Sequence, residues 1–226
     1  MNLLVGIPAY NEEKMIAFVI ESIPKKIKGI KSIDILVLDD GSSDRTANEA
    51  EKHGVKVLVH ILNRGLGGAL KTILAYSNGK NYDILVTFDA DGQHKGADIS
   101  RLINPIQKGN YDMVIGTRWK DRSQTPFSRL LINKLANIFT YLLYGVVTSD
   151  SQSGMRALGK RAIDSISLQT DGMEVSSEFF KEITRNKLRF MEIPIKAVYT
   201  DYSKAKGQKI TNAPKVFWQL LLRLLR

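Results

Sequence analysis

Two aspartates separated by one residue are the first candidates for chemistry in this sequence. Asp89 and Asp91 belong to the stretch DADGQH, which directly follows a run of apolar residues. In an extended segment, side chains two positions apart point the same way, so both carboxylates can converge on one cation. Hard oxygen ligands suit Mg²⁺ or Mn²⁺. We therefore predict a divalent metal site at this pair, to which Gln93 or His94 could add a ligand. The alternative is an ordinary Asp-Gly turn.

A second acidic pair, Asp39 and Asp40, opens the stretch DDGSSD after another apolar run. Ser43 or Asp44 is suited to capping the following helix, but capping does not require the paired aspartates. A carboxylate at a strand end can accept hydrogen bonds from a base or ribose, as in dinucleotide folds. The glycines of residues 63–70 lack the spacing of a phosphate loop, and we expect close backbone packing at the start of a helix there.

Basic residues are concentrated in the second half of the chain. The net charge of the protein is +10, and residues 181–226 contain 11 Lys/Arg against 3 Asp/Glu. In the stretch GTRWKDRSQTPFSR, Arg118 and Arg129 could grip a phosphate bidentately, whereas Arg122 fits a solvated surface. The simplest explanation for the remaining basic residues is a solvated surface. The more specific explanation is that they bind an anionic lipid or a phosphorylated substrate. Nucleic acid is the weakest candidate because no nucleic-acid-binding module is recognisable.

Alternating apolar runs and helical patterns predict the architecture. We expect strands at 3–7, 33–38, 55–59, 84–88 and 113–115, and helices near 12–23, 44–53, 67–77 and 97–107. Such alternation predicts an α/β fold with a mostly parallel sheet flanked by helices. Ligands of such sheets bind beyond the carboxyl ends of the strands, so the polar loops that follow four of these strands should converge on one edge. The chain has no cysteine, which excludes disulfides and cysteine-ligated zinc.

The second half has a different pattern. We expect helices at 127–147 and 173–186, a strand at 190–195 and a mobile polar loop at 199–209. Residues 211–226 predict an amphipathic C-terminal helix with one narrow basic stripe. Its apolar stretch is far below the ~20 residues needed to span a bilayer. A basic stripe and a broad apolar face suit a membrane interface, and packing on the core or on another subunit is the alternative.

Five short stretches, taken together and in order, resemble a known family. PAYNEE (8–13), LDDGSSDRT (38–46), FDADGQH (88–94), GTRW (116–119) and DSQSGMRAL (150–158) are similar to motifs of the inverting family 2 glycosyltransferases, which have the GT-A fold, a Rossmann-like sheet. The similarity is greater to the polyprenyl-phosphate sugar transferases of the dolichyl-phosphate mannose synthase type. It covers nearly the whole chain.

The resemblance implies a role for each matching residue. Donor-nucleotide contacts would come from Pro8, Tyr10, Asn11, Glu12, Asp39, Asp40, Asp89 and Ala90. The divalent metal on the diphosphate would be carried by Asp89, Asp91 and Gln93. Acceptor phosphate and catalysis would involve Asp91, Arg118, Arg129 and Lys204, the last standing where the family has an arginine-containing loop. Lysine there loses the bidentate fork. Glu174 and Glu178 match acidic helix residues of the family.

The resemblance also implies the function. We expect a GT-A domain at 1–210, with a nucleotide-sugar half (1–120) and an acceptor half (121–210), followed by the helix at 211–226. The reaction would move a sugar from a nucleoside-diphosphate sugar, of the GDP-mannose or UDP-glucose type, to a polyprenyl phosphate, with Mg²⁺ or Mn²⁺. The protein would be cytoplasmic and peripheral on the membrane surface, without a nucleic-acid partner.

Three other functions remain open on the sequence alone. A saccharide hydroxyl acceptor would demand a general base, for which Asp91 or Glu178 is available. A sugar-phosphate nucleotidyltransferase also uses paired acids on an α/β sheet, but its glycine-rich N-terminal signature is missing. A non-catalytic nucleotide-sugar or lipid-binding module is the third, and the intact metal and nucleotide motifs argue against it.

Overall fold

A single seven-stranded sheet forms the centre of the protein, in the order β3-β2-β1-β4-β6-β5-β7. The computed structural model describes residues 1–118, 127–196 and 198. The strands are β1 (Asn2–Ala9), β2 (Ser32–Asp39), β3 (Lys56–Val59), β4 (Ile84–Thr87), β5 (Met113–Thr117), β6 (Arg156–Gly159) and β7 (Phe190–Pro194). β6 runs antiparallel to both of its neighbours, and the other described pairs are parallel. The predicted mostly parallel α/β sheet is confirmed.

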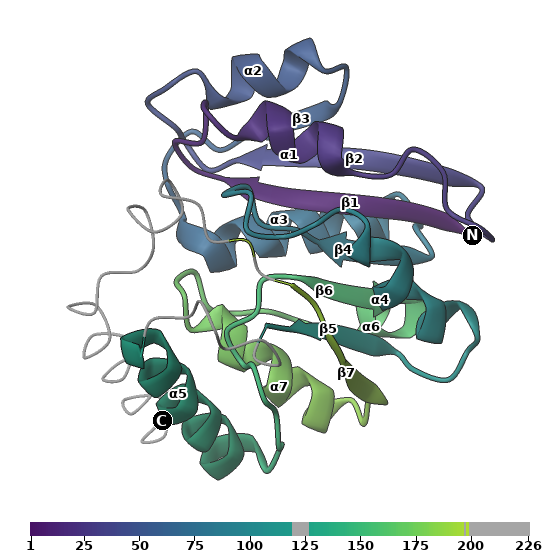
Figure 1. Ribbon diagram of the computed structural model, residues 1–226, viewed down its shortest axis with the longest axis vertical. Coiled ribbons are helices and arrows are strands. Elements are labelled where there is room, and N and C mark those ends of the chain that lie inside the picture. The colour runs from purple at the N-terminus through teal and green to yellow at the C-terminus, as the bar shows by residue number, and fades with distance from the viewer. Residues whose placement is uncertain (119–126, 197, 199–226) are drawn as a thin grey trace.

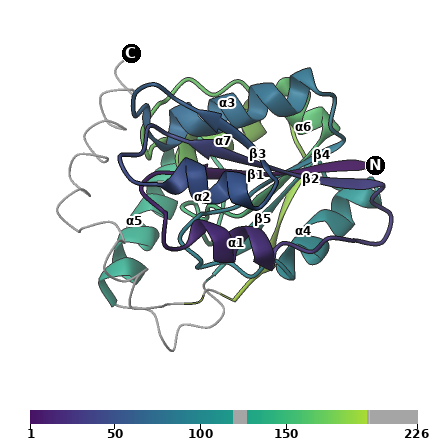
Figure 2. The same cartoon turned by 90° about the horizontal axis from the view of Figure 1, so that it is seen from above.

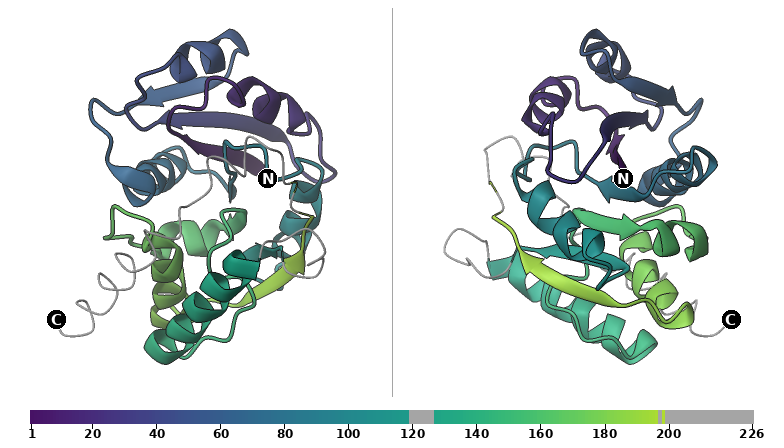
Figure 3. Two further views of the ribbon diagram at one scale, coloured as in Figure 1. Left: turned by 60° about the vertical axis from the view of Figure 1, so that its left-hand side comes forward. Right: turned by 90° about the vertical axis from the view of Figure 1, so that its right-hand side faces the viewer.

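Helices cover both faces of this sheet (Figures 1 and 2). They are α1 (Ile16–Ser22), α2 (Thr46–Lys52), α3 (Gly65–Gly79), α4 (Asp98–Gln107), α5 (Phe127–Tyr144), α6 (Lys160–Ser165) and α7 (Val175–Arg185). α1, α2 and α4 lie on one face, and α3, α6 and α7 lie on the other. α5 packs beside α7, as the side views in Figure 3 show. No described helix is long and apolar enough to cross a membrane.

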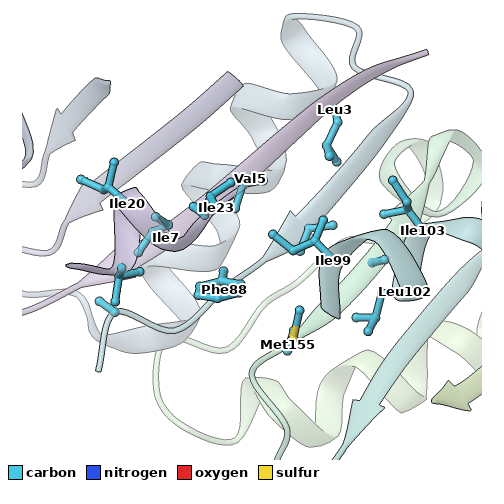
Figure 4. Close-up of a cluster of buried hydrophobic side chains, with 14 of the residues drawn as sticks. Leu3, Val5, Ile7, Ile20, Ile23, Phe88, Ile99, Leu102, Ile103 and Met155 are labelled. Atoms are coloured by element: carbon cyan, nitrogen blue, oxygen red, sulfur yellow. The ribbon is translucent and has the colours of Figure 1, made fainter. Parts of the chain in front are cut away.

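The central strand β1 is apolar from Leu3 onward because both of its faces are covered. Leu3, Val5 and Ile7 point into the cluster under α1 and α4 (Figure 4), and Leu4 belongs to the cluster on the opposite face. At Gly6 a Cβ would overlap the side chain of Ile73 in α3. Glycine at this position therefore lets α3 lie directly against the strand.

β6 is the strand that the sequence analysis does not predict, and the short helix α6 after it was missed as well. β6 is four residues long and contains an arginine and a glycine, so it lacks the run of β-branched residues that identifies strands. It forms because β4 and β5 offer hydrogen-bonding edges on both sides. The other predicted elements are present with ends shifted by up to four residues. Residues 199–209 and 211–226 lie outside the described residues.

The carboxyl ends of β1, β2, β4 and β5 meet at one edge of the sheet, at the opposite end from the N-terminus (Figure 1). This confirms the predicted convergence of the four polar loops. The antiparallel β6 adds a fifth segment, because its amino end delivers residues 150–155 to the same edge. One sheet thus combines strands from the first 120 residues with strands from the remainder.

Candidate active site

The loops after β1 and β2 are joined to each other by hydrogen bonds. The Asn11 N–H donates to Ser42 Oγ at 2.9 Å, and Asn11 Oδ1 accepts from the Ser43 N–H at 2.8 Å. Asn11 has a φ of 54°, a conformation that asparagine tolerates better than most residues. The buried Glu12 N–H donates to Thr46 Oγ1 at 2.7 Å. The first two motifs therefore form one rigid unit.

Asp40 holds the loop that leads into α3. Its buried carboxylate accepts hydrogen bonds from His60 Nδ1–H at 2.7 Å, from the Arg64 N–H at 2.9 Å and from the Gly65 N–H at 2.7 Å. Its neighbour Asp39, also buried, accepts from the Ser42 N–H at 2.9 Å. These bonds give Asp40 a structural function.

The glycines at the start of α3 allow close backbone approach, as predicted. The N–H groups of Gly67 and Gly68 donate to the carbonyl oxygen of Asp171 at 2.8 and 3.2 Å. A Cβ at Gly67 would overlap the carbonyl oxygen of Thr170. The segment at 170–172 comes from the second half of the chain, so this contact fixes the start of α3 to that half.

Glu178 of α7 supports that segment. Its Oε1 accepts from the Gln169 N–H at 2.8 Å, and its Oε2 accepts from the Thr170 N–H at 2.9 Å and from Thr170 Oγ1 at 2.7 Å. The side chain is buried. These bonds engage both carboxylate oxygens, so Glu178 holds the backbone of Gln169 and Thr170 in place. The role of general base considered from the sequence does not fit a carboxylate with these partners. Glu174, at the start of α7, is buried against Gly172.

Asp89 and Asp91 lie together in the loop after β4. Burial, followed by the negative charge of Asp89, raises the pKa of Asp91 to about 6. Burial also raises the pKa of Asp89, but the hydrogen bond from His94 and the charges of Arg118 and Arg156 outweigh it and hold that pKa below its usual value. Both side chains are half-buried. Two neighbouring carboxylates that repel each other form a site whose repulsion a bound cation would reduce.

The ligand set fits Mg²⁺ or Mn²⁺. Asp89 and Asp91 offer carboxylate oxygens, and Gln93, whose N–H donates to Asp91 Oδ1 at 2.9 Å, adds an amide. In the described ranges no group of three or more His, Asp or Glu side chains is arranged to hold a metal. Mg²⁺ in proteins typically uses one or two carboxylates and completes its shell with water and phosphate oxygens.

The orientation of Asp89 is fixed from two sides. His94 Nε2–H donates to Asp89 Oδ2 at 2.9 Å, and the buried imidazole meets the Phe88 ring edge-on with centroids 5.7 Å apart. On the other side, a Cβ at Gly154 would overlap the Asp89 carboxylate. His94 thus supports Asp89 through its side chain, a common arrangement behind metal-binding carboxylates and histidines.

Arg118 forms a two-pronged ion pair with Asp150. Its Nε and one terminal nitrogen each donate to a different carboxylate oxygen of Asp150 at 2.8 Å, and its backbone N–H donates at 3.1 Å. Asp150 is completely buried. The pair fixes the plane of the guanidinium at the site edge. Arg129 lies in the first turn of α5, where its side chain is outside the description, and Lys204 lies outside the described residues.

Arg156, the first residue of β6, is the buried cation of this edge. Burial lowers its pKa to about 10, against the attraction of Asp89 and Asp150. Its guanidinium carbon lies 4.7 Å from the centroid of the Phe179 ring. The sequence analysis assigned no function to Asp150 or Arg156, although both belong to the stretch DSQSGMRAL. A charged residue next to an apolar run was the one available signal.

Apart from Arg129 in α5 and Lys204, which lies outside the described residues, the predicted site residues lie on this one edge. They are Pro8, Tyr10, Asn11, Glu12, Asp39, Asp40, Asp89, Ala90, Asp91, Gln93 and Arg118. Residues 4–167 match the model of glycosyl transferase family 2. The chain belongs to this family.

Two of the relatives are named as sugar transferases that act on polyprenyl phosphates. The chain is 36% identical over 238 residues to a UDP-N-acetylglucosamine–dolichyl-phosphate N-acetylglucosaminyltransferase of Methanococcus voltae, covering 96% of this chain and 93% of that one. It is 29% identical over 244 residues to an undecaprenyl-phosphate mannosyltransferase of Micrococcus luteus, covering 99% and 96%. The protein is therefore a family 2 glycosyltransferase with polyprenyl-phosphate sugar transferases among its relatives.

A solved structure confirms the fold. Glucosyl-3-phosphoglycerate synthase from Mycobacterium tuberculosis, in complex with Mn²⁺ and UDP-glucose, superposes with a TM-score of 0.74 at 22% identity, covering 99% of this chain and 78% of that one. The predicted GT-A-like fold is confirmed by this match.

Proposed function

We propose that this glycosyltransferase moves a sugar from a nucleoside-diphosphate sugar to a polyprenyl phosphate, with inversion and with Mg²⁺ or Mn²⁺. The observation that carries the proposal is the placement of the Asp89–Asp91 pair and the Arg118–Asp150 pair on one edge of the sheet. A diphosphate leaving group needs a cation, and a phosphate acceptor needs a basic group. The relatives that act on dolichyl and undecaprenyl phosphates support the same acceptor class.

The donor side consists of the rigid unit after β1 and β2. Pro8, Tyr10, Asn11, Glu12 and Asp39 would surround the nucleotide. Asp40 would act indirectly, because its carboxylate holds the loop before α3. A divalent metal held by Asp89, Asp91 and Gln93 would supply Lewis-acid stabilisation of the departing diphosphate.

On the acceptor side, positively charged side chains would bind the acceptor phosphate, and no general base is required. A phosphate monoester has a second pKa of ~6 and is already anionic at neutral pH, so it attacks without a strong general base. Arg118 would bind it, with its guanidinium plane fixed by Asp150. Arg129 and Lys204 would complete this basic surface. The Val198 N–H donates to the Gln93 carbonyl oxygen at 2.9 Å, so the chain contacts the metal loop six residues before Lys204.

A saccharide hydroxyl acceptor is the second candidate. It is favoured by Asp91, whose pKa of about 6 suits a general base near neutral pH. The two candidates differ in their acceptors. Incubation with UDP- and GDP-sugars, with either polyprenyl phosphate or soluble saccharides, and with Mg²⁺, Mn²⁺ or a chelator, separates them when the product is identified by mass. We expect a lipid-linked sugar phosphate in the presence of metal. Transfer to saccharides alone contradicts the proposal.

We further propose that the protein binds peripherally to a membrane surface. Exposed apolar side chains on α5, including Leu135, Ile138 and Leu142, form part of the contact surface, and residues 211–226 would add the amphipathic helix predicted from the sequence. Flotation with liposomes measures this. Removal of residues 211–226 should reduce liposome binding, and unchanged binding would rule out their anchoring function.

A further inference from the structure

The segment at 148–151, which carries Asp150, lies between α5 and β6 and belongs to neither. Side chains hold the backbone of this segment in place. The Ser149 N–H donates to Glu192 Oε1 of β7 at 2.8 Å, and Ser149 Oγ donates to Glu192 Oε2 at 2.6 Å. Ser149 Oγ also lies 2.7 Å from Oγ1 of Thr117, the residue before Arg118. The position of Asp150 therefore depends on the side chains that hold its neighbours.

Asn137 of α5 binds the backbone on both sides of Asp150. Its Nδ2 donates to the Ser149 carbonyl oxygen at 2.8 Å, and its Oδ1 accepts from the Ser151 N–H at 2.9 Å. Because a carbonyl oxygen only accepts and an N–H only donates, these two partners define the orientation of the amide. Asn133, about one helical turn earlier, donates to the same Ser149 carbonyl oxygen at 3.0 Å.

Asp150 transmits this constraint to Arg118. The Asp150 carboxylate is completely buried and accepts from two guanidinium nitrogens of Arg118, each at 2.8 Å. A displacement of the Asp150 backbone would therefore displace the guanidinium as well. Such displacements matter for catalysis, since a misplacement of about 1 Å can lower a rate roughly a hundredfold.

We propose that Asn137 is a positioning residue for the acceptor phosphate, which holds Asp150 from both sides and through it sets the plane of the Arg118 guanidinium. This role depends on Arg118 binding the acceptor phosphate, as in the proposed function. α5 also exposes Ile138 and Leu142, so the helix proposed to contact the membrane is the one that holds the carboxylate behind Arg118.

A double-mutant cycle between Asn137 and Arg118 tests this role. Asn137→Leu removes both hydrogen bonds at similar side-chain volume, and Asn137→Ala removes them without added apolar bulk. Arg118→Lys keeps a charge beside Asp150 but has no plane to orient. With polyprenyl phosphate as the varied substrate, we expect each Asn137 variant to lower kcat/KM roughly tenfold, and Arg118→Lys to lower it roughly tenfold or more.

The combined variants provide the decisive measurement. In the Arg118→Lys background, the Asn137 substitutions should have little further effect, because residues that act through one another are not additive. KM for the sugar donor and the Mn²⁺ dissociation constant should stay unchanged in the Asn137 variants. A purely structural role would instead lower all of these quantities in either background.

Asn186→Leu is the matched control. Asn186 is also a half-buried asparagine, and its Nδ2 donates to the Glu182 carbonyl oxygen at 3.1 Å. It lies shortly before β7, which is parallel to β5, and so at the opposite edge of the sheet from the site. We expect Asn186→Leu to lower the free energy of unfolding, measured by urea denaturation, and to leave kcat/KM for the acceptor unchanged.

Each contrary result has a different meaning. Normal acceptor kcat/KM in both Asn137 variants, together with an impaired Arg118→Lys, overturns the role of Asn137 and leaves the proposed function intact. An equal loss in both Arg118 backgrounds, or failure of both Asn137 variants to fold, would show that Asn137 serves the fold alone. Normal acceptor kcat/KM in Arg118→Lys would overturn the assignment of Arg118 to the acceptor phosphate, and the role of Asn137 with it.

Discussion

Carboxylates have different partners on the two sides of the site edge. Next to β1 and β2, Asp40 accepts from the backbone N–H groups of Arg64 and Gly65 as well as from His60 Nδ1–H, and Asp44 accepts from the backbone N–H of Thr46 at 2.9 Å. Next to β4, β5 and β6, the partners are mainly side chains: Asp89 accepts from the His94 imidazole and Asp150 from the Arg118 guanidinium. Aspartate therefore holds the backbone of a loop next to β1 and β2, whereas next to β4, β5 and β6 it pairs with side chains of the site.

This difference predicts two roles for the carboxylates: those next to β1 and β2 hold loops in place, and those next to β4, β5 and β6 contribute to catalysis. Bonds from backbone N–H groups satisfy a carboxylate and hold a loop, and their loss should appear mainly as lost stability. Preorganised side-chain charges in a dry site act on charge that develops during reaction, and their loss should appear mainly as lost rate. The variants below test whether the two sides respond in these two ways.

The largest effect is expected at Asp91. Asp91→Asn should lower the rate of sugar transfer roughly a thousandfold, because the diphosphate would lose a metal ligand worth several kcal/mol. The free energy of unfolding without metal should not fall, because the ionised Asp91 is destabilised by burial and by Asp89. Transfer assays and urea denaturation measure the two effects. Asp164→Asn, which removes an exposed partner of Lys160, is the matched control and should alter neither. Retained transfer in Asp91→Asn would place the chemistry elsewhere.

Asp40→Asn should show the opposite behaviour. The substitution weakens the bonds that hold His60, Arg64 and Gly65, and we expect the free energy of unfolding to drop by about 2–3 kcal/mol. In the folded fraction, kcat should remain within a few-fold while KM for the donor increases. Urea denaturation and steady-state kinetics distinguish these effects. A large loss of kcat at full stability would show that Asp40 acts directly on the substrate.

The pH dependence of metal binding should report the protonation of Asp91. Because burial and Asp89 raise its pKa to about 6, protonation competes with the metal as the pH falls through 6. We expect Mn²⁺ affinity to be nearly constant above pH 7 and to fall about tenfold by pH 5. The same shift means that the contribution of Asp91 to the stability of the metal-free protein is lost as the pH rises from about 4 to 6, because the folded state binds this proton more tightly than the unfolded state does. Calorimetry across this range measures the affinity, and a flat profile would contradict the assignment of Asp91.

The smallest effect is expected at Ser42. Ser42→Ala removes the acceptor for the Asn11 N–H, and one such bond contributes about 1 kcal/mol. The loss should appear in the free energy of unfolding, with a smaller increase in donor KM than in Asp40→Asn. Thermal denaturation with paired kinetics measures it. If Ser42→Ala changed kcat and left stability intact, the division between scaffold and chemistry would not hold on this side.

The sequence by itself determined the α/β class, most strands and helices, and the edge at which the site lies. These follow from local patterns: an apolar run ends in a polar cluster at β1, β2, β4 and β5, and parallel strands must bring such clusters together. The cation site proposed at Asp89 and Asp91 is a prediction from the sequence, because their spacing lets both carboxylates converge on one ion.

Only the tertiary structure decided what the individual charges do. β6 forms because β4 and β5 provide hydrogen bonds on both of its sides, and no pattern within its own four residues requires it. In β6, Arg156 becomes buried over the ring of Phe179. Asp40 and Glu178 are held by hydrogen bonds from other segments of the chain. Burial and partner choice depend on segments distant in the chain, so local sequence cannot specify them.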